Sequence, residues 1–193
     1  MLLDAYLRHY DLVERHRAVV RASREDTYRA LREADFVRTL RPVARSITEM
    51  RNVPRAIGEL VRRALRLPPD TTYTIADALA GGFALLGERR GRAVAVGAIG
   101  TLWKPDVAFR QITPAEFGAF DEPKYAKLAV AFWVERVGRD KSALRFEARL
   151  AATDDSARAH VRRWYRMVHP FTSFFMRRAL SDIRAEAAAP VVS

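Results

Sequence analysis

Two residues near the N-terminus, Glu14 and His16, have the types and spacing of an acid–base pair. Apolar and polar residues partly alternate from Leu12 to Ala22, which predicts a half-buried β-strand. Glu14 and His16 share one parity, so both side chains would lie on the same face of that strand. Such a pair could transfer a proton, with His16 as a weak candidate for the base. Because no paired-carboxylate or triad spacing accompanies it, a surface pair or a structural histidine is the commoner alternative.

A second pair, Glu147 and Arg149, lies on a predicted strand from Ala143 to Ala152. The two side chains again share one face, whereas the apolar residues of the strand occupy the other face: Leu144, Phe146, Ala148 and Leu150. We interpret Glu147 and Arg149 as a structural ion pair, or as cross-strand partners, on the outer side of the sheet.

Six large aromatic side chains form the third candidate group: Trp103, Phe132, Phe146, Trp164, Phe171 and Phe175. A set of this kind is typical of the wall of an apolar ligand cavity. Any single member is more often plain core, because large apolar residues generally lie inside a domain. We expect at least part of the set to line a cavity.

The composition argues against several other kinds of site. The chain has no cysteine and only four scattered histidines, so we expect no disulfide, no metal site and no cofactor. The net charge is +11, and 30 of the 34 basic residues are arginine, but the charge is spread along the whole chain. Binding to nucleic acid or to an anionic membrane is one interpretation. A solvated arginine-rich surface, with no specific nucleic-acid partner, is the simpler one.

The length of 193 residues fits a single domain, 1–193, with a sizeable core. The first residues lack the pattern of a signal peptide, and no apolar run is long enough to span a membrane. We therefore expect a soluble cytoplasmic protein.

The remaining elements must position these residues. Ser23, with Asp26 three residues later, predicts the start of a short helix whose apolar face includes Tyr28 and Leu31. A second helical region, 35–67, is expected to break near Pro42 and again at residues 52–54. Its last part, Arg55 to Leu67, is basic and amphipathic; it could lie on an anionic membrane, but we expect it to dock on the body of the protein.

Strands are predicted at Phe83–Glu88, Ala93–Trp103 and Lys127–Val137, the last forming a hairpin with Ala143–Ala152. On Lys127–Val137 we favour the face of Phe132 as the inward one. The long connection 105–123 contains three phenylalanines, which favours a packed lid or rim over a solvated tether.

A long basic helix is predicted from Ala157 to Ala188. Its apolar residues recur every three or four positions and define one buried stripe: Val161, Trp164, Val168, Phe171, Phe175, Ala179 and Ile183. Pro170 should kink the helix or unwind it briefly. A long aromatic-faced helix after a series of strands most simply covers the concave side of a curved sheet.

This order of elements resembles the helix-grip fold of the START-like or Bet v 1-like superfamily, also called the SRPBCC or polyketide cyclase-like group. The similarity runs from about residue 5 to residue 187 and is closest to an uncharacterised bacterial branch. It depends on a set of short motifs: Tyr6-Leu7, Tyr10-Asp11, Gly82-Phe83, the segment 97–105, Glu147–Leu150, Trp164-Tyr165, Pro170 and Met176-Arg177-Arg178. The resemblance implies an α+β fold with a curved antiparallel sheet wrapped around a long C-terminal helix, and two short helices after the first strand.

The resemblance also implies a cavity between sheet and helix. Our leading hypothesis is a non-enzymatic protein that binds a small hydrophobic or lipid-like ligand there. The alternative is an enzyme of the polyketide cyclase or dehydratase type acting in the same cavity. A third is a peripheral lipid-transfer or nucleic-acid-associated protein that uses the positive surface. The ligand and the oligomeric state are left open.

Overall fold

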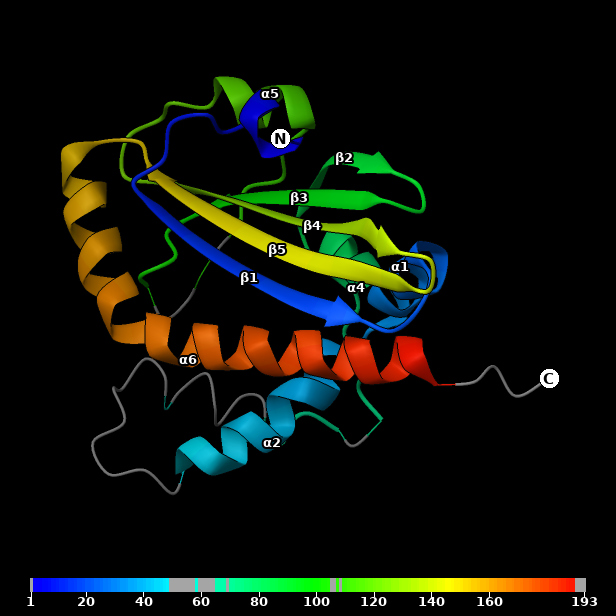
Figure 1. Ribbon diagram of the computed structural model, residues 1–193. Coiled ribbons are helices and arrows are strands. Elements are labelled where there is room, and N and C mark those ends of the chain that lie inside the picture. The colour runs from blue at the N-terminus through cyan, green and yellow to red at the C-terminus, as the bar shows by residue number, and fades with distance from the viewer. Residues whose placement is uncertain are drawn as a thin grey trace.

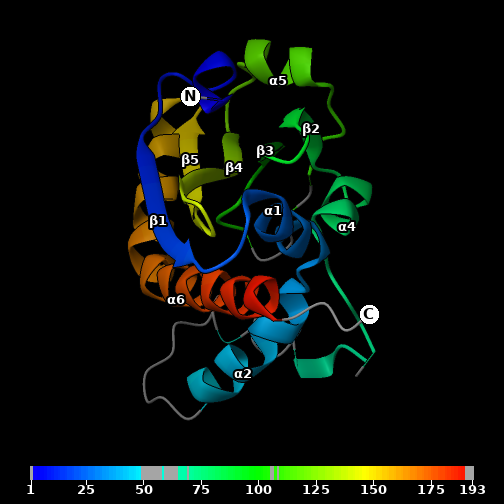
Figure 2. The same cartoon turned by 45° about the vertical axis from the view of Figure 1, so that its right-hand side comes forward.

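The computed structural model describes residues 2–48, 58, 65–68, 70–104, 107 and 109–189. Its centre is a curved five-stranded antiparallel sheet in the order β1-β5-β4-β3-β2. The strands are β1 (Leu12–Val20), β2 (Ala84–Arg89), β3 (Ala93–Gly100), β4 (Ala126–Gly138) and β5 (Lys141–Ala152). A long C-terminal helix, α6 (Asp155–Ala188), runs along the concave side, as Figures 1 and 2 show. This α+β arrangement is the helix-grip fold.

The strand register confirms the predicted hairpin and its inward face. Phe132 on β4 pairs with Phe146 on β5, and Phe146 in turn pairs with His16 on β1. Phe132 and Phe146 are buried in the cluster that also contains Met176 of α6. The face of Phe132 therefore looks toward α6, as expected from its alternation.

Helix α1 (Arg24–Glu33) begins where the sequence predicts. The Ser23 hydroxyl accepts a hydrogen bond from the backbone N–H of Asp26, 3.0 Å away, and so caps the helix. Tyr28 and Leu31 are buried.

Helix α2 (Phe36–Thr48) runs through Pro42, so the break expected there is wrong. Pro42 lies on the exposed side of the helix, and its neighbours Val43 and Ala44 pack against Val168 of α6. That packing holds the helix together despite the lost backbone donor. The predicted break at 52–54 lies outside the described residues, as does most of the basic stretch 55–67.

Two short helices were missed. Helix α4 (Ile75–Ala80) starts with a capping box between Thr74 and Asp77, and α5 (Pro114–Ala119) starts with one between Thr113 and Glu116. Helix α5 lies on the side of the sheet opposite α6 (Figure 1). Helix α5 belongs to the long connection 105–123, for which a packed lid or rim was expected. Its Phe117 is fully buried, but it joins the apolar cluster on the convex face of the sheet and does not form a lid over the concave face.

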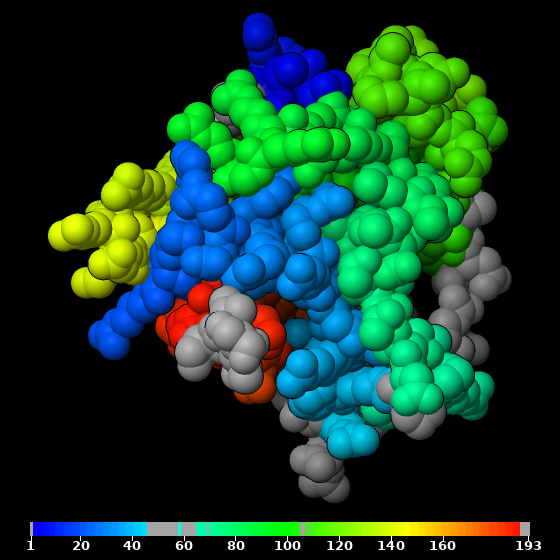
Figure 3. All heavy atoms as spheres, turned by 90° about the vertical axis from the view of Figure 1, so that its right-hand side faces the viewer, coloured from blue at the N-terminus to red at the C-terminus, as the bar shows by residue number. Residues whose placement is uncertain are grey.

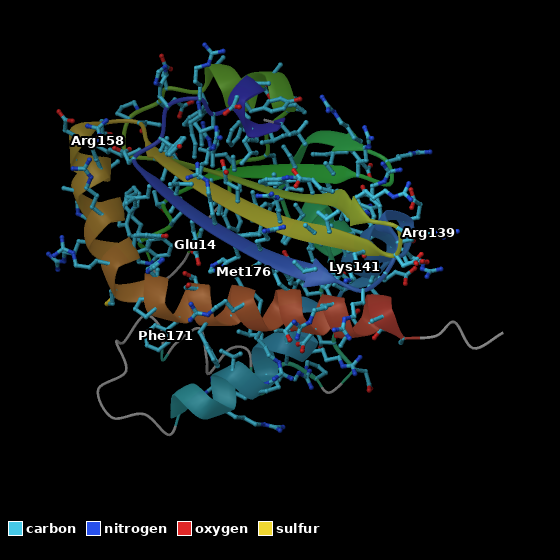
Figure 4. The ribbon with its side chains drawn as sticks, viewed as in Figure 1. Glu14, Arg139, Lys141, Arg158, Phe171 and Met176 are labelled. Atoms are coloured by element: carbon cyan, nitrogen blue, oxygen red, sulfur yellow. The ribbon has the colours of Figure 1, made fainter. Side chains whose placement is uncertain are left out.

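Helix α6 is continuous over 34 residues and contains Pro170. Its ribbon changes direction sharply, close to the labelled Phe171 in Figure 4. The kink predicted at Pro170 is therefore present as a bend that divides α6 into two arms. No described helix has both the length and the hydropathy that a membrane span requires.

Candidate acid–base and ligand site

Glu14 and His16 both lie on the concave face of the sheet. In the register of β1 with β5, they occupy the two inward positions between Leu12, which pairs with Leu150, and Ala18, which pairs with Leu144. Leu12 belongs to an apolar cluster at the N-terminal arm of α6, and Ala18 to another at its C-terminal arm. The pair is therefore a polar interruption in an apolar face, and Figure 4 shows Glu14 between β1 and α6.

The two side chains bind each other and the helix. The His16 Nε2 atom lies 2.7 Å from Glu14 Oε1, and only 12% and 7% of the two side chains are exposed. The Thr172 hydroxyl donates to Glu14 Oε2 at 3.3 Å, and the Ser173 hydroxyl lies 3.4 Å from His16 Nε2. Thr172 and Ser173 lie two and three residues after Pro170, so the bend of α6 is next to the turn that places both hydroxyls against β1.

This cluster does not have the arrangement of a nucleophilic triad. Glu14 and the Ser173 hydroxyl approach the same ring nitrogen of His16, whereas a triad places its carboxylate and its nucleophile on opposite nitrogens. In the neutral tautomer of His16 that donates from Nε2 to the carboxylate, Nδ1 is the acceptor. Among the described residues Nδ1 has no hydrogen-bond partner, so the pair suits proton transfer or hydrogen bonding to a bound molecule.

Tyr165 of α6 adds a third polar group to this region. Its phenol oxygen is buried and has no hydrogen-bond partner in the described part of the chain. Burial, and then the nearby Glu14 carboxylate, raise the pKa of Tyr165 to about 12. The phenol is therefore a protonated donor at neutral pH, and the Glu14 carboxylate beside it is an acceptor, although the two do not meet hydrogen-bond geometry.

The six predicted aromatic residues do not form one group. Phe132 and Phe146 are in contact with ring centroids 5.1 Å apart, and Phe36 of α2 links Phe132 to Phe175. Trp164 and Phe171 pack against the cluster of Val43, Ala44 and Val168 between α2 and α6. Trp103 packs near the start of α6, where its ring stacks on His160 at 5.6 Å. Whether any of them binds a ligand stays a prediction.

Two cavities lie on the convex side of the sheet. One, of about 290 Å³, is lined by Leu2, Leu3, Trp133 and Glu147 among others. The other is an open groove of about 540 Å³ beside α5, lined by polar and charged residues such as Arg110 and Glu122.

The predicted ion pair of Glu147 and Arg149 is confirmed, on the convex face. Arg149 Nε donates to Glu147 Oε1 at 2.6 Å, and Arg149 also contacts Asp4 and the backbone oxygen of Leu7, both at 2.8 Å. Arg15 Nε donates to the second oxygen of Glu147 at 2.7 Å. Although the pair is on the outer side of the sheet, it is buried, because the N-terminal segment with η1 (Leu2–Ala5) covers that face.

Sequence reasoning found Glu14 and His16 but missed Tyr165, Thr172 and Ser173. The available signal was the position of Thr172 and Ser173, two and three residues after Pro170, in an otherwise apolar and arginine-rich helix. Hydroxyl residues at a helix bend can bind groups of another element, but their spacing does not say which.

Comparison with known proteins adds little to this geometry. No protein-family model matches the chain, and no curated protein matches it either. Among solved structures, the chain is similar to the Zhui aromatase/cyclase from Streptomyces sp. R1128, with 12% sequence identity and a TM-score of 0.35 over 91% of this chain and 93% of that one. A similarity this weak carries no argument about function. The helix-grip description therefore rests on the sheet and α6 of this chain.

Proposed function

We propose that this protein binds a small hydrophobic or lipid-like molecule between the concave face of the sheet and α6, and that Glu14 and His16 hold the polar group of that ligand. The observation that carries the proposal is the buried polar pair on a face that is otherwise apolar and aromatic. A buried pair of polar side chains is often less stabilising than an apolar pair of the same volume. A role in recognising a ligand accounts for its place.

The surrounding groups give the ligand a definite chemistry. The Tyr165 phenol offers a hydrogen bond, and His16 Nδ1 accepts one. A mainly apolar molecule with an oxygen function that both donates and accepts would satisfy the two groups together. Its apolar part would be bound by burial against aromatic walls, at about 25 cal/mol per Å².

A hollow in the surface, visible in Figure 3, is the entrance that we propose for such a ligand. The surface is hollowed beside the red C-terminal end of α6, between it and the blue and cyan segments of α1 and α2. We expect the ligand to pass from solvent into the concave side through this opening.

An enzyme of the cyclase or dehydratase type is the second candidate, at the same site. One specific observation favours it: a carboxylate fixes the imidazole of His16 at 2.7 Å, which orients the ring for proton transfer. His16 would be the base, and the Tyr165 phenol would stabilise a developing negative charge on a carbonyl oxygen.

Native mass spectrometry of protein purified from its host tests the binding proposal. We expect a co-purified apolar molecule, lost from the double variant with Glu14→Leu and His16→Leu but retained by the matched double variant with Glu135→Leu and Arg145→Leu, an exposed pair on the other face of the sheet. Empty wild-type protein, together with no shift of melting temperature across a lipid and aromatic library, would refute the proposal.

The binding function and the enzymatic function predict different effects of the substitution His16→Gln. Glutamine keeps a hydrogen-bonding side chain but cannot act as a base at neutral pH. A binding protein should lose affinity by a few-fold with the ligand recovered unchanged. An enzyme should convert the same molecule in the wild type and fail to do so in the variant.

A further inference from the structure

The outward side of α6 carries an apolar ridge at its bend. Met167, Pro170 and Phe174 are spaced by three and four residues, so they lie on one side of the helix. All three are exposed, with 37% of Met167 and 48% of Phe174 accessible to solvent. These residues take no part in the contacts of α6 with the sheet or with α2 described above.

Arginines surround this ridge on both arms of the helix. Arg163 and Arg166 lie before the bend, and Arg177 and Arg178 lie after it; all four are exposed. Between Asp155 and Asp182 the helix contains six arginines and no carboxylate.

Three of these six arginines form no ion pair with a described residue, whereas Arg158 and Arg162 both pair with Asp11. Among the described residues, Arg163, Arg166 and Arg177 form no ion pair, and Arg177 donates a hydrogen bond to the Ser173 hydroxyl at 3.4 Å. Arg178 is paired with Asp182 at 2.9 Å. A local excess of positive charge around exposed apolar side chains favours an anionic and partly apolar partner.

We propose that this corner of α6 docks on a bilayer that contains anionic phospholipids, with Met167 and Phe174 entering the interface and Arg163, Arg166 and Arg177 binding lipid phosphates. The geometry fits because a bilayer accepts a convex apolar ridge, whereas a folded partner would need a matching groove. Arginine also binds phosphate oxygens through two parallel hydrogen bonds.

The position of the ridge connects it to the concave site. Pro170 and Phe174 face outward on the same turns of α6 from which Thr172 and Ser173 contact Glu14 and His16. Docking would therefore bring the bend next to a reservoir of apolar molecules. The docking proposal does not depend on ligand binding, since it rests on exposed residues alone.

Co-sedimentation with vesicles tests the proposal. Phosphatidylcholine vesicles containing about 30% phosphatidylserine should bind the full chain, and binding to pure phosphatidylcholine should be much weaker. The double variant with Arg163→Gln and Arg166→Gln should bind the anionic vesicles about 30-fold more weakly, from about fivefold per arginine near such a surface. The matched control is Arg89→Gln with Arg90→Gln, two exposed arginines at the β2–β3 turn, which should lose about threefold or less by the general charge effect.

The apolar contribution is tested separately. Met167→Ser with Phe174→Ser should weaken binding by about tenfold, because less apolar surface enters the interface. Val19→Ser with Val137→Ser removes two equally exposed apolar side chains, 48% and 47% accessible, from β1 and β4, and should leave binding unchanged. Melting temperatures of all variants check that the fold is intact.

Three results would overturn the proposal: no binding to anionic vesicles by the wild type, equal loss in the ridge variants and their controls, or binding to a single-stranded oligonucleotide that the ridge variants lose while vesicle binding is absent. The last result would assign the surface to nucleic acid instead.

Discussion

The two faces of the sheet each carry a carboxylate and a basic residue two positions apart, and the two pairs have opposite surroundings. On the convex face, Glu147 receives hydrogen bonds from Arg149 and Arg15, and Arg149 also binds Asp4 and Leu7. On the concave face, Glu14 and His16 bind each other closely, but their contacts to α6 are long, at 3.3 and 3.4 Å. A saturated network holds structure together, whereas an unsaturated one has capacity left for a ligand.

Removal of the Arg149 guanidinium should have the largest effect on the stability of the protein. Arg149→Leu should lower the free energy of unfolding by about 3–5 kcal/mol, because it leaves the 1%-exposed Glu147 carboxylate with only Arg15 and frees the N-terminal segment. Urea unfolding measures the change. Arg145→Leu, on the same strand and face but paired with Glu135 near solvent, should cost less than about 1 kcal/mol. Equal losses in the two variants would contradict the structural role of Arg149.

Replacing both members of each pair sharpens the comparison. Glu14→Leu with His16→Leu should leave the unfolding free energy unchanged or raise it by about 1–4 kcal/mol, since Thr172 keeps a bond to the His169 carbonyl and Ser173 one from Arg177. Glu147→Leu with Arg149→Leu should be destabilising, because Arg15, Asp4 and the Leu7 carbonyl each lose one of their partners. Thermal and urea unfolding measure the stability of the two double variants. If the variant lacking Glu14 and His16 is as unstable as the variant lacking Glu147 and Arg149, then Glu14 and His16 are structural residues.

The titration of Tyr165 should have the smallest effect on stability. It tests directly whether Tyr165 interacts with Glu14 on the concave side of the sheet. Its pKa is about 12 in the folded protein, against about 10 for the free side chain, so the neutral phenol is favoured by folding. The associated stability is complete below pH 10 and is lost as the pH rises from 10 to 12. Ultraviolet titration of the wild type and of Tyr165→Phe isolates this step. Glu14→Gln should lower the pKa of Tyr165 without restoring the ordinary value, because burial is the larger cause; no change at all would separate Tyr165 from the pair.

Local pattern was sufficient to predict most of the elements. The alternation of β5 predicted its faces, Ser23 with Asp26 predicted the start of α1, and the stripe from Val161 to Ile183 predicted α6 with its bend at Pro170. These features depend on residues within a few positions of one another. Pro42 shows the limit of such rules, because the packing of α2 on α6 outweighs one lost backbone donor. The short helices α4 and α5 were missed because each has only six residues, and the capping box at its first turn is its main signal in the sequence.

The sequence by itself determined that a curved antiparallel sheet precedes a long, bent, aromatic-faced helix, and that Glu14 and His16 share a side of the first strand. Only the tertiary structure decided what surrounds each pair. Pairing of β1 with β5 and the bend of α6 bring Thr172 and Ser173 to side chains nearly 160 positions earlier, and the N-terminal segment buries Arg149 on the opposite face. Alternation along a strand separates its two faces, but what covers each face is set by contacts between distant segments. Those contacts give Glu147 and Arg149 several short hydrogen bonds, whereas Glu14 and His16 have short contacts only with each other and longer ones to α6.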